Sequence, residues 1–281
     1  MPGRLLAWFL LLVAWSGCQS APDPLAPSNN RNWSPDQAVV PTAKFKGDTV
    51  TVQNVRYCKY FDTSTYVVDY NDRTYDLNKI RGVDFLMVPF PVAPALAHTM
   101  LSFEFETAAD SNKRSGESDH VVVSVETRKE VGERYSPLAG SARQFELIYV
   151  VADERDAVQL RTNFRNDQVY LYRTVATPSG ARKLFVDVMQ RANKLAKEPE
   201  FYDTITNNCT TNIAAHINRL QPDRVLYDWR ILLPGYSDRK AYEAGLLATK
   251  LPFEQAQANA KITAKAQLAA GRDDFSERIR R

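Results

Sequence analysis

Cys209 has the clearest chemical potential in the chain, and it lies within the sequence Thr-Asn-Asn-Cys-Thr-Thr. Small capping residues precede a stretch of helical spacing there, so we expect a helix to begin near Asn207 or Asn208. Unsatisfied N–H groups and the dipole at a helix N-terminus stabilise a thiolate and a developing oxyanion. Cys209 is therefore the candidate nucleophile. The alternative is a structural disulfide with Cys58, the other cysteine that remains if Cys18 is lipidated.

A thiol nucleophile needs an imidazole within hydrogen-bonding reach, and the chain has three histidines. His216 follows Cys209 by seven residues, about 10 Å along the same helix, so we expect a hydrogen-bonded histidine rather than the base. His120 opens a strand after a polar loop, where an exposed histidine is the default. His98 begins a strand on its polar face and is the candidate base.

A third group is expected to orient the imidazole. If the strand that begins at His98 pairs with a strand over 121–128, Glu126 or Ser124 can face the ring. We prefer Glu126, because a carboxylate both fixes the tautomer and stabilises the imidazolium. The alternative for Glu126 is an ion pair at the sheet surface with one of two arginines, Arg128 or Arg143.

Two periodicities divide the rest of the chain. Period-two patterns and β-branched runs predict strands over 49–52, 65–68, 98–105, 121–128, 145–151 and 168–172. Helical spacing predicts helices over 179–195, from 207 or 208 to 220, and over 253–270. The apolar stretch 85–97 contains three prolines, so we expect a buried extended loop rather than a helix or central strand. The polar residues 110–118 are expected to form a hairpin tip. Residues 44–281 are therefore predicted to be one α+β domain, with an antiparallel sheet of four to six strands packed against helices.

The N-terminus has the pattern of a signal peptide over residues 1–17, with Arg4 followed by an apolar run that covers only about 16 Å. Small residues before Cys18 resemble a bacterial lipobox, which predicts lipidation of Cys18; an ordinary secretory cleavage site is the alternative. Gln19 rather than Asp then favours the outer membrane. Residues 18–43 are proline-rich and are expected to form a tether. We expect a periplasmic protein that is held to membrane lipid by this acyl anchor.

The composition narrows the function classes further. The chain has 281 residues, with 36 Lys and Arg against 33 Asp and Glu, and this near balance argues against nucleic-acid binding. A hydrophobic content of 44% is that of an ordinary globular protein. The three scattered histidines and the lack of clustered carboxylates or a glycine-rich phosphate loop predict no metal and no cofactor.

Five ordered segments carry a resemblance to a known family. They are Ala97–Phe103, Ser124–Arg128, Tyr202–Thr210, Leu233–Asp238 and Asp274–Arg280. Over residues 33–280 the chain resembles the Lnb N-terminal periplasmic domain family. The resemblance implies a permuted papain-like fold of the NlpC type, with Cys209 as nucleophile and His98 as base. It also implies roles for the polar strand motif Ser124, Glu126 and Arg128. The family's named member moves an acyl chain onto the N-terminal amine of a lipoprotein and carries further membrane segments.

Two functions follow as hypotheses. The first is a cysteine-dependent acyltransferase or hydrolase that acts on an ester or amide of a lipid, lipoprotein or peptide through a thioester. Its catalytic residues are Cys209, His98 and Glu126, and its supporting or substrate-binding residues are Ser124, Arg128, Asn208 and Ser102. The second is a non-catalytic envelope lipoprotein that binds a lipid or protein partner on a papain-like scaffold.

Overall fold

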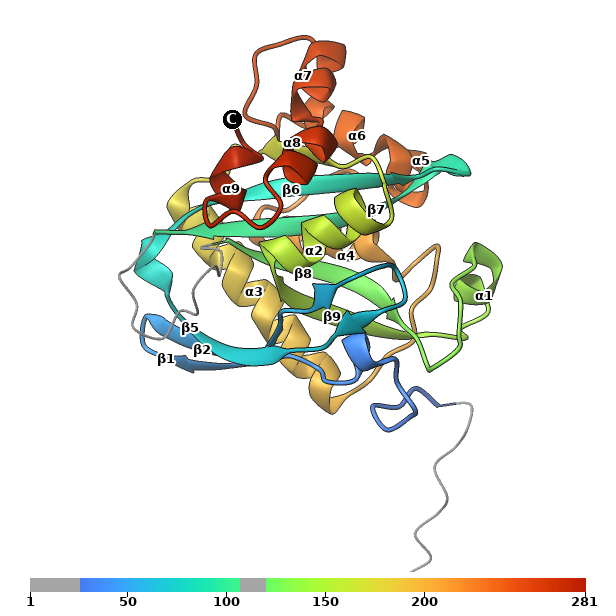
Figure 1. The fold of residues 1–281 in the computed structure, drawn as a ribbon. Helices are drawn as coiled ribbons and strands as arrows, with labels where there is room; N and C mark the ends of the chain where they lie inside the picture. The colour runs from blue at the N-terminus through green and yellow to red at the C-terminus, as the bar shows by residue number, and fades with distance from the viewer. Residues whose placement is uncertain (1–25, 107–119) are drawn as a thin grey trace, which may run out of the picture.

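The computed structural model describes residues 26–106 and 120–281, so the expected signal peptide, Cys18 and the hairpin tip over 110–118 lie outside the described residues. An eight-stranded sheet forms the centre, in the order β1-β2-β9-β8-β7-β6-β10, with β5 paired to β2 (Figure 1). Its strands are β1 Thr42–Lys46, β2 Thr49–Arg56, β5 Tyr70–Asp76, β6 Ile80–Phe90, β7 Ala93–Phe105, β8 His120–Arg128, β9 Glu146–Asp153 and β10 Tyr170–Arg173. Only the β2–β9 pair is parallel among the described strands. The fold is thus mixed α/β with a mostly antiparallel sheet packed against helices, and the sheet is larger than the four to six strands expected.

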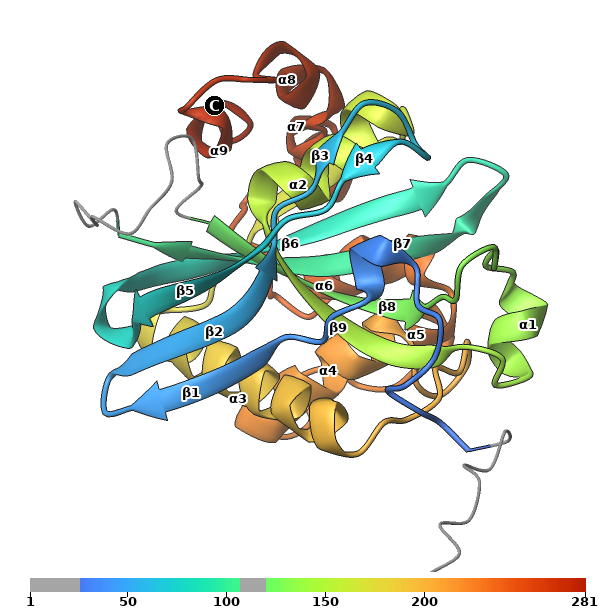
Figure 2. The same cartoon turned by 60° about the horizontal axis from the view of Figure 1, so that its bottom comes forward.

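Helices cover both faces of this sheet (Figures 1 and 2). On one face lie α3 (Pro178–Lys197) and α4 (Cys209–Leu220), whose apolar residues join the larger core cluster. On the other face lie α2 (Glu154–Gln159), α8 (Thr263–Leu268) and α9 (Phe275–Arg278), which pack in a second cluster. Every residue of the central strand β9 is buried, as expected for a strand covered on both sides.

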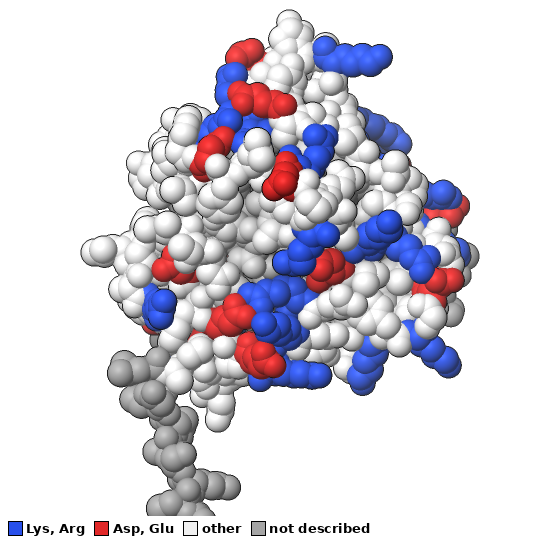
Figure 3. Space-filling model, turned by 180° about the vertical axis from the view of Figure 1, so that it is seen from behind, with Lys and Arg blue, Asp and Glu red and all other residues white. Residues whose placement is uncertain are grey.

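The remaining elements are short and lie around the ends of the sheet. They are η1 Pro35–Gln37, β3 Lys59–Tyr60, β4 Tyr66–Val67, η2 Leu77–Lys79, α1 Pro137–Ser141, η3 Leu160–Phe164, α5 Trp229–Leu232, η4 Pro234–Tyr236, α6 Ser237–Glu243 and α7 Phe253–Ala260. Strands β3 and β4 form a separate two-stranded ribbon, so the predicted strand over 65–68 is only two residues long. The described residues contain no helix that is both long enough and apolar enough to cross a membrane. Acidic and basic side chains are interspersed on the face drawn in Figure 3.

Two of the three predicted helices form where the pattern placed them. Thr177 caps α3 by accepting from the Gly180 N–H, two residues before the expected cap at Ser179. The stripe of apolar residues along α3 is buried against the sheet. The expected helix over 253–270 is instead two helices, α7 and α8. The chain breaks between them because Lys261 forms a β-bridge with Tyr170 and the Ile262 N–H donates to the Val169 carbonyl.

The proline-rich stretch is a strand hairpin, and our prediction of an extended loop over 85–97 was wrong. Strands β6 and β7 pair along most of this stretch, with Val88 opposite His98 and Pro89 opposite Ala97. The prolines are tolerated because the strands on either side of this hairpin do not pair with the part that contains them. Strand β10 pairs with β6 only up to Met87, and β8 pairs with β7 only from Met100. This hairpin projects from the molecule beyond the rest of the sheet (Figures 1 and 2).

Residues 26–43 lie against the folded body, which differs from the behaviour expected of a tether. Trp33 and Gln37 are buried, and the guanidinium of Arg128 lies 4.1 Å from the centre of the Trp33 ring. Gln37 donates to the Thr127 carbonyl and accepts from the Lys129 N–H, so it bonds to strand β8 and the residue that follows it. Proline content alone did not reveal these long-range contacts, because the partners are about 90 residues away in sequence.

Gly235 is required where η4 meets the hairpin. A Cβ at this position would lie 1.9 Å from the Pro94 carbonyl oxygen, which is far inside van der Waals contact. We therefore expect Gly235→Ala to lower the free energy of unfolding by about 1–3 kcal/mol, measured by urea denaturation. Gly132→Ala is unsuitable as a control because its φ is +90°, so Gly180→Ala, where a Cβ meets only Thr177 at 3.4 Å, is the matched variant. Equal effects in both variants would contradict the prediction.

Candidate active site

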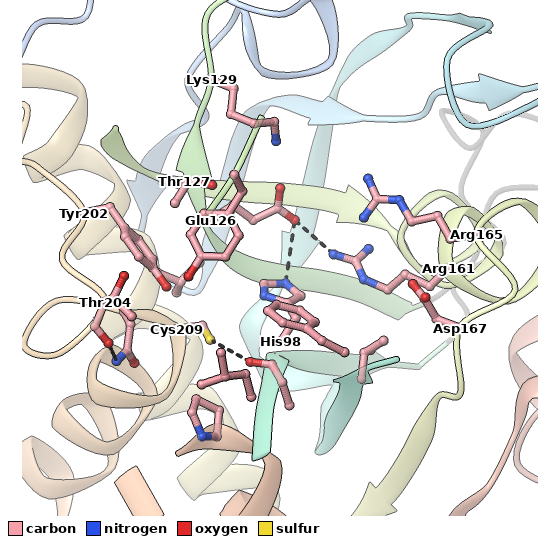
Figure 4. A pocket seen from close by; sticks show the side chains of 18 of the residues that line it. His98, Glu126, Thr127, Lys129, Arg161, Arg165, Asp167, Tyr202, Thr204 and Cys209 are labelled. Carbon is pink, nitrogen blue, oxygen red and sulfur yellow. Dashed lines mark hydrogen bonds and ion pairs between the residues drawn. The ribbon is translucent and has the colours of Figure 1, made fainter. Parts of the chain in front are cut away.

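A cavity of about 210 Å³ lies where the ends of β7 and β8 meet the start of α4 (Figure 4). Cys209, His98, Glu126 and Asn208 all line it. These four residues come from positions as much as 111 residues apart, so only the fold brings them together. The β6–β7 hairpin and η4 form part of the wall, since Leu96 and Pro234 also line the cavity.

Cys209 is the first residue of α4, as the capping pattern predicted. Asn208 caps the helix: its side chain accepts from the Thr211 N–H, and the Thr211 hydroxyl accepts from the Asn208 N–H. The N–H groups of Cys209 and Thr210 have no acceptor among the described residues, as first-turn groups generally lack one. Two donors therefore lie next to the sulfur. This is the local arrangement that suits a thiolate and an oxyanion.

The Cys209 thiol is free. Cys58 is free as well, so the disulfide considered as an alternative does not form. The Cys209 Sγ lies 3.9 Å from the carbonyl oxygen of Ala97, the residue immediately before His98. Figure 4 draws the sulfur and the His98 ring on neighbouring walls of the cavity.

His98, Ser124 and Glu126 form a hydrogen-bonded chain. Strands β7 and β8 pair antiparallel with Met100 opposite Ser124, and the same register continued by two residues places Glu126 across from His98. The Ser124 Oγ lies 2.6 Å from His98 Nε2 and donates to Glu126 Oε1 at 2.7 Å. The direct distance from His98 Nε2 to Glu126 Oε1 is 3.7 Å. The serine hydroxyl is thus the bridge between the ring and the carboxylate.

The hydrogen bonds of the Ser124 hydroxyl determine the tautomer of His98. Because the Ser124 proton is donated to Glu126, the serine oxygen accepts from the His98 Nε2–H. The proton of a neutral imidazole is then on Nε2, and Nδ1 carries the lone pair. Nδ1 has no hydrogen-bond partner among the described residues. His98 is therefore arranged to accept a proton at Nδ1.

The surroundings of His98 and Glu126 lower the pKa of both groups, for different reasons. Burial lowers the pKa of His98 to about 3, and Arg161 adds to the lowering while Glu126 opposes it. Burial alone would raise the pKa of Glu126, but the attraction of Arg161 and His98 outweighs it and holds that pKa well below its usual value. At neutral pH the pair is therefore a neutral imidazole and a carboxylate.

The structure adds two partners of Glu126 that the sequence did not indicate. Arg161 donates to Oε1 at 3.1 Å, and Gln37 donates to Oε2 at 3.0 Å. The alternative expected for Glu126, an ion pair with Arg128 or Arg143, does not occur; the arginine that pairs with it is Arg161, from η3. No local pattern singles out Arg161, because η3 is one turn of an irregular helix. Tyr202 also lines the cavity and was not predicted.

Of the four expected supporting residues only Asn208 lines the cavity, and two of the other three are engaged elsewhere. Arg128 donates to the carbonyl oxygens of Gln37 and Ala38, so it fastens the N-terminal segment to the sheet. Ser102 donates to Glu154 at 2.6 Å, in a buried polar cluster farther along β7. The other two, Ser124 and Asn208, take part in the arrangement around His98 and Cys209.

The remaining histidines are engaged elsewhere. His216 is bonded to Tyr149 at 2.8 Å through Nε2 and to Asp187 through Nδ1, in agreement with the expectation of a hydrogen-bonded histidine on α4. His120 is buried rather than exposed, and burial lowers its pKa while nearby Glu154 opposes the shift. Neither ring lines the cavity around Cys209. Within the described residues, no group of three or more His, Cys, Asp or Glu side chains is arranged to hold a metal ion.

Comparison with known proteins gives one family. The model of the Lnb N-terminal periplasmic domain matches residues 66–235, which is more than half of the chain and includes His98, Glu126 and Cys209. The chain has no significant match to a curated protein or to a solved structure. A periplasmic location fits this family.

Proposed function

The chain belongs to the Lnb N-terminal periplasmic domain family, and from this premise we propose that it is a cysteine-dependent acyltransferase or hydrolase. One observation carries the proposal: His98 and Glu126, which the Ser124 hydroxyl joins by hydrogen bonds, line the same cavity as the free thiol of Cys209. A nucleophile, a base with a free lone pair and a carboxylate that orients the base are the components of thiol acyl chemistry.

The first half of the reaction forms a thioester. His98 Nδ1 takes the proton from the Cys209 thiol, and the sulfur attacks the carbonyl carbon of an ester or amide. The carbonyl oxygen becomes an oxyanion, which the N–H groups of Cys209 and Thr210 stabilise. The tetrahedral intermediate collapses with cleavage of the C–O or C–N bond. The leaving alcohol or amine takes the proton from the His98 imidazolium, and the acyl group stays on sulfur.

The second half reverses these roles. His98 takes a proton from water or from an acceptor amine, whose oxygen or nitrogen attacks the thioester carbon. The C–S bond breaks, and the Cys209 thiolate recovers the proton from His98. Glu126 stabilises the imidazolium in both halves, acting through the Ser124 hydroxyl. Attack by water makes the protein a hydrolase, and attack by an amine or alcohol makes it a transferase.

Exposed apolar residues around the cavity support an apolar substrate. The hairpin tip carries Val92, which is 97% exposed, and α1 carries Leu138, which is 82% exposed. The hairpin and the segment just before α1 meet at the cavity wall, where the rings of Phe90 and Tyr135 lie 6.3 Å apart. Trp229 on α5 is also more than half exposed. Exposed apolar side chains on the elements that surround a cavity suit an apolar ligand, so we propose an acyl chain of a lipid or lipoprotein as substrate.

The finer fold and the location complete the proposal. We propose a permuted papain-like arrangement, because the nucleophile begins a helix, the base lies on an antiparallel strand, and the histidine precedes the cysteine in the chain. We also propose that Cys18 is lipidated and holds the protein to the outer membrane. Cys18 is only eight residues before the first described residue, so in an anchored chain residue 26 would lie within about 30 Å of the lipid anchor.

Acylation of the intact protein tests the function. With p-nitrophenyl octanoate we expect one octanoyl group per chain, located on Cys209 by mass spectrometry and absent in Cys209→Ser. Cys58→Ser is the matched control and should retain full acylation, because burial raises the pKa of the Cys58 thiol to about 12 and leaves it almost wholly protonated. Acylation of Cys58, or of neither cysteine, would favour a non-catalytic binding protein instead.

A further inference from the structure

A second cavity, of about 450 Å³, lies on the side of α4 away from the thiol. It is enclosed by α3, α4 and α6 and by strands β6 and β7. Its inner wall is apolar and includes Phe85, Leu101, Leu184, Ile213 and Leu247. No residue lines both this cavity and the one around Cys209. The apolar cavity is therefore a separate compartment of the molecule.

One wall of the apolar cavity carries an unpartnered polar atom. Ser237, at the start of α6, is 5% exposed, and its hydroxyl has no hydrogen-bond partner among the described residues. Buried hydroxyls are generally hydrogen-bonded, since an unsatisfied one loses its hydration without compensation. Ser237 lines the cavity, so a ligand inside it can supply the missing partner.

A cation lies beside this hydroxyl. Lys240 follows Ser237 by three residues on α6, which places both side chains on one helix face, and both line the cavity. Lys240 Nζ donates to Asp228 at 2.6 Å, and an ammonium group has two further N–H donors. Asp228 is already paired with Arg230 as well. The α6 wall thus offers one hydroxyl and spare N–H donors to an acceptor oxygen.

We propose that the apolar cavity binds an unbranched aliphatic chain that ends in a carboxyl oxygen. The acceptor oxygen bonds to Ser237 and Lys240, and the chain lies against the apolar inner wall. The same chemistry occurs in a free long-chain carboxylate and in an acyl chain esterified in a phospholipid. Lys183 and Arg224 at the rim add positive charge, which suits an anionic ligand. This site does not rest on the thiol chemistry.

Binding is tested by calorimetric titration of the intact protein with dodecanoate. Each methylene added between octanoate and dodecanoate is expected to tighten binding about fourfold if the chain is buried. Ser237→Ala should weaken dodecanoate binding about 5–10-fold, and Ala241→Phe, which places a ring into the cavity from α6, should abolish it. Ser179→Ala changes an exposed serine at the rim and is the matched control, expected to bind like the wild type.

Two further experiments identify the source of the aliphatic chain and test whether the site is independent of Cys209. Phosphatidylglycerol vesicles that displace dodecanoate would identify an esterified chain as a ligand, and vesicles without effect would leave the free carboxylate; both support the site. Cys209→Ala should bind dodecanoate normally, so loss of acyl-transfer activity and loss of binding are separable. The proposal is overturned if neither ligand binds at 1 mM, or if binding is unchanged in both Ser237→Ala and Ala241→Phe. Circular dichroism verifies that each variant is folded.

Discussion

His98→Gln is expected to lower the rate at which p-nitrophenyl octanoate acylates Cys209 by about 10²–10⁴-fold at pH 7. Glutamine retains a hydrogen-bonding group near Ser124, but it has no basic nitrogen to take the thiol proton. The rate is measured from the release of p-nitrophenolate in a stopped-flow experiment, and mass spectrometry of peptides verifies that the acyl group is on Cys209.

The neighbouring residues give graded expectations for the same assay. Glu126→Gln keeps the shape of the hydrogen-bonded chain but removes the charge that stabilises the imidazolium, so we expect a smaller loss than in His98→Gln. His120→Gln changes a buried histidine outside the cavity and should leave the rate per folded molecule unchanged. A His98→Gln rate within threefold of the wild type would remove the base from the mechanism.

The low pKa of His98 also predicts the pH dependence. Burial lowers this pKa to about 3 from an ordinary value of 6.5, so the imidazole is already neutral at pH 5. The acylation rate should therefore have no step near pH 6.5. The sign of the effect on stability is equally definite: the unfolded chain binds the proton more readily between pH 6.5 and 3. The contribution of His98 to stability is full above pH 6.5 and is lost as the pH falls toward 3, which urea denaturation of wild type and His98→Gln can resolve.

Arg280→Met is expected to lower the free energy of unfolding by about 3–5 kcal/mol, the usual cost of leaving buried charges without their partner. Arg280 is next to the C-terminus, yet it bonds to Glu154 at 2.6 and 2.8 Å and to Asp84 at 2.8 Å. Both carboxylates are fully buried. Burial alone would lower the pKa of Arg280, but the attraction of Glu154 and Asp84 raises it. Without Arg280, two carboxylates lose their main counter-ion.

The adjacent residue is the matched control. Among the described residues the Arg281 guanidinium pairs with Glu277 alone, at the exposed surface, so Arg281→Met should cost less than about 0.5 kcal/mol. The pH dependence separates charge from packing. Burial alone would raise the pKa of Glu154, but Arg280 outweighs it and lowers the pKa to about 2 from 4.5. The stability that ionised Glu154 contributes to the wild type is present above pH 4.5 and is lost toward pH 2. The difference in the free energy of unfolding between the wild type and Arg280→Met should therefore shrink at pH 4. An unchanged difference would mean that the arginine acts through packing.

Parts of the site could be predicted because local sequence patterns determine them. Asn208 and Thr211 have side chains that cap a helix, so the start of α4 at Cys209 follows from four adjacent residues. The alternation after His98 determines which residues share a face of β7. Alternation predicted strands over 98–105 and 121–128, and the pairing considered for them as a condition is the one that brings Ser124 and Glu126 near His98.

Other parts depended on contacts between distant segments. Arg161 and Gln37 reach Glu126 from elements 35 and 89 residues away, and nothing in their local sequence differs from that of other polar residues. The prolines of the hairpin argued against strands. They are accommodated only because the neighbouring strands end before them, which depends on the whole sheet.

The sequence by itself determined the capped helix that begins at Cys209, the strand that carries His98 and the family to which the chain belongs. These features depend on caps and periodicities that extend over a few residues. Only the tertiary structure decided that Ser124 bridges His98 and Glu126 and that Arg161 keeps Glu126 ionised. It also decided that the Ser237 hydroxyl has no hydrogen-bond partner among the described residues around the apolar cavity. Hydrogen bonding, burial and electrostatics at these positions depend on distances between segments, and a linear pattern does not contain those distances.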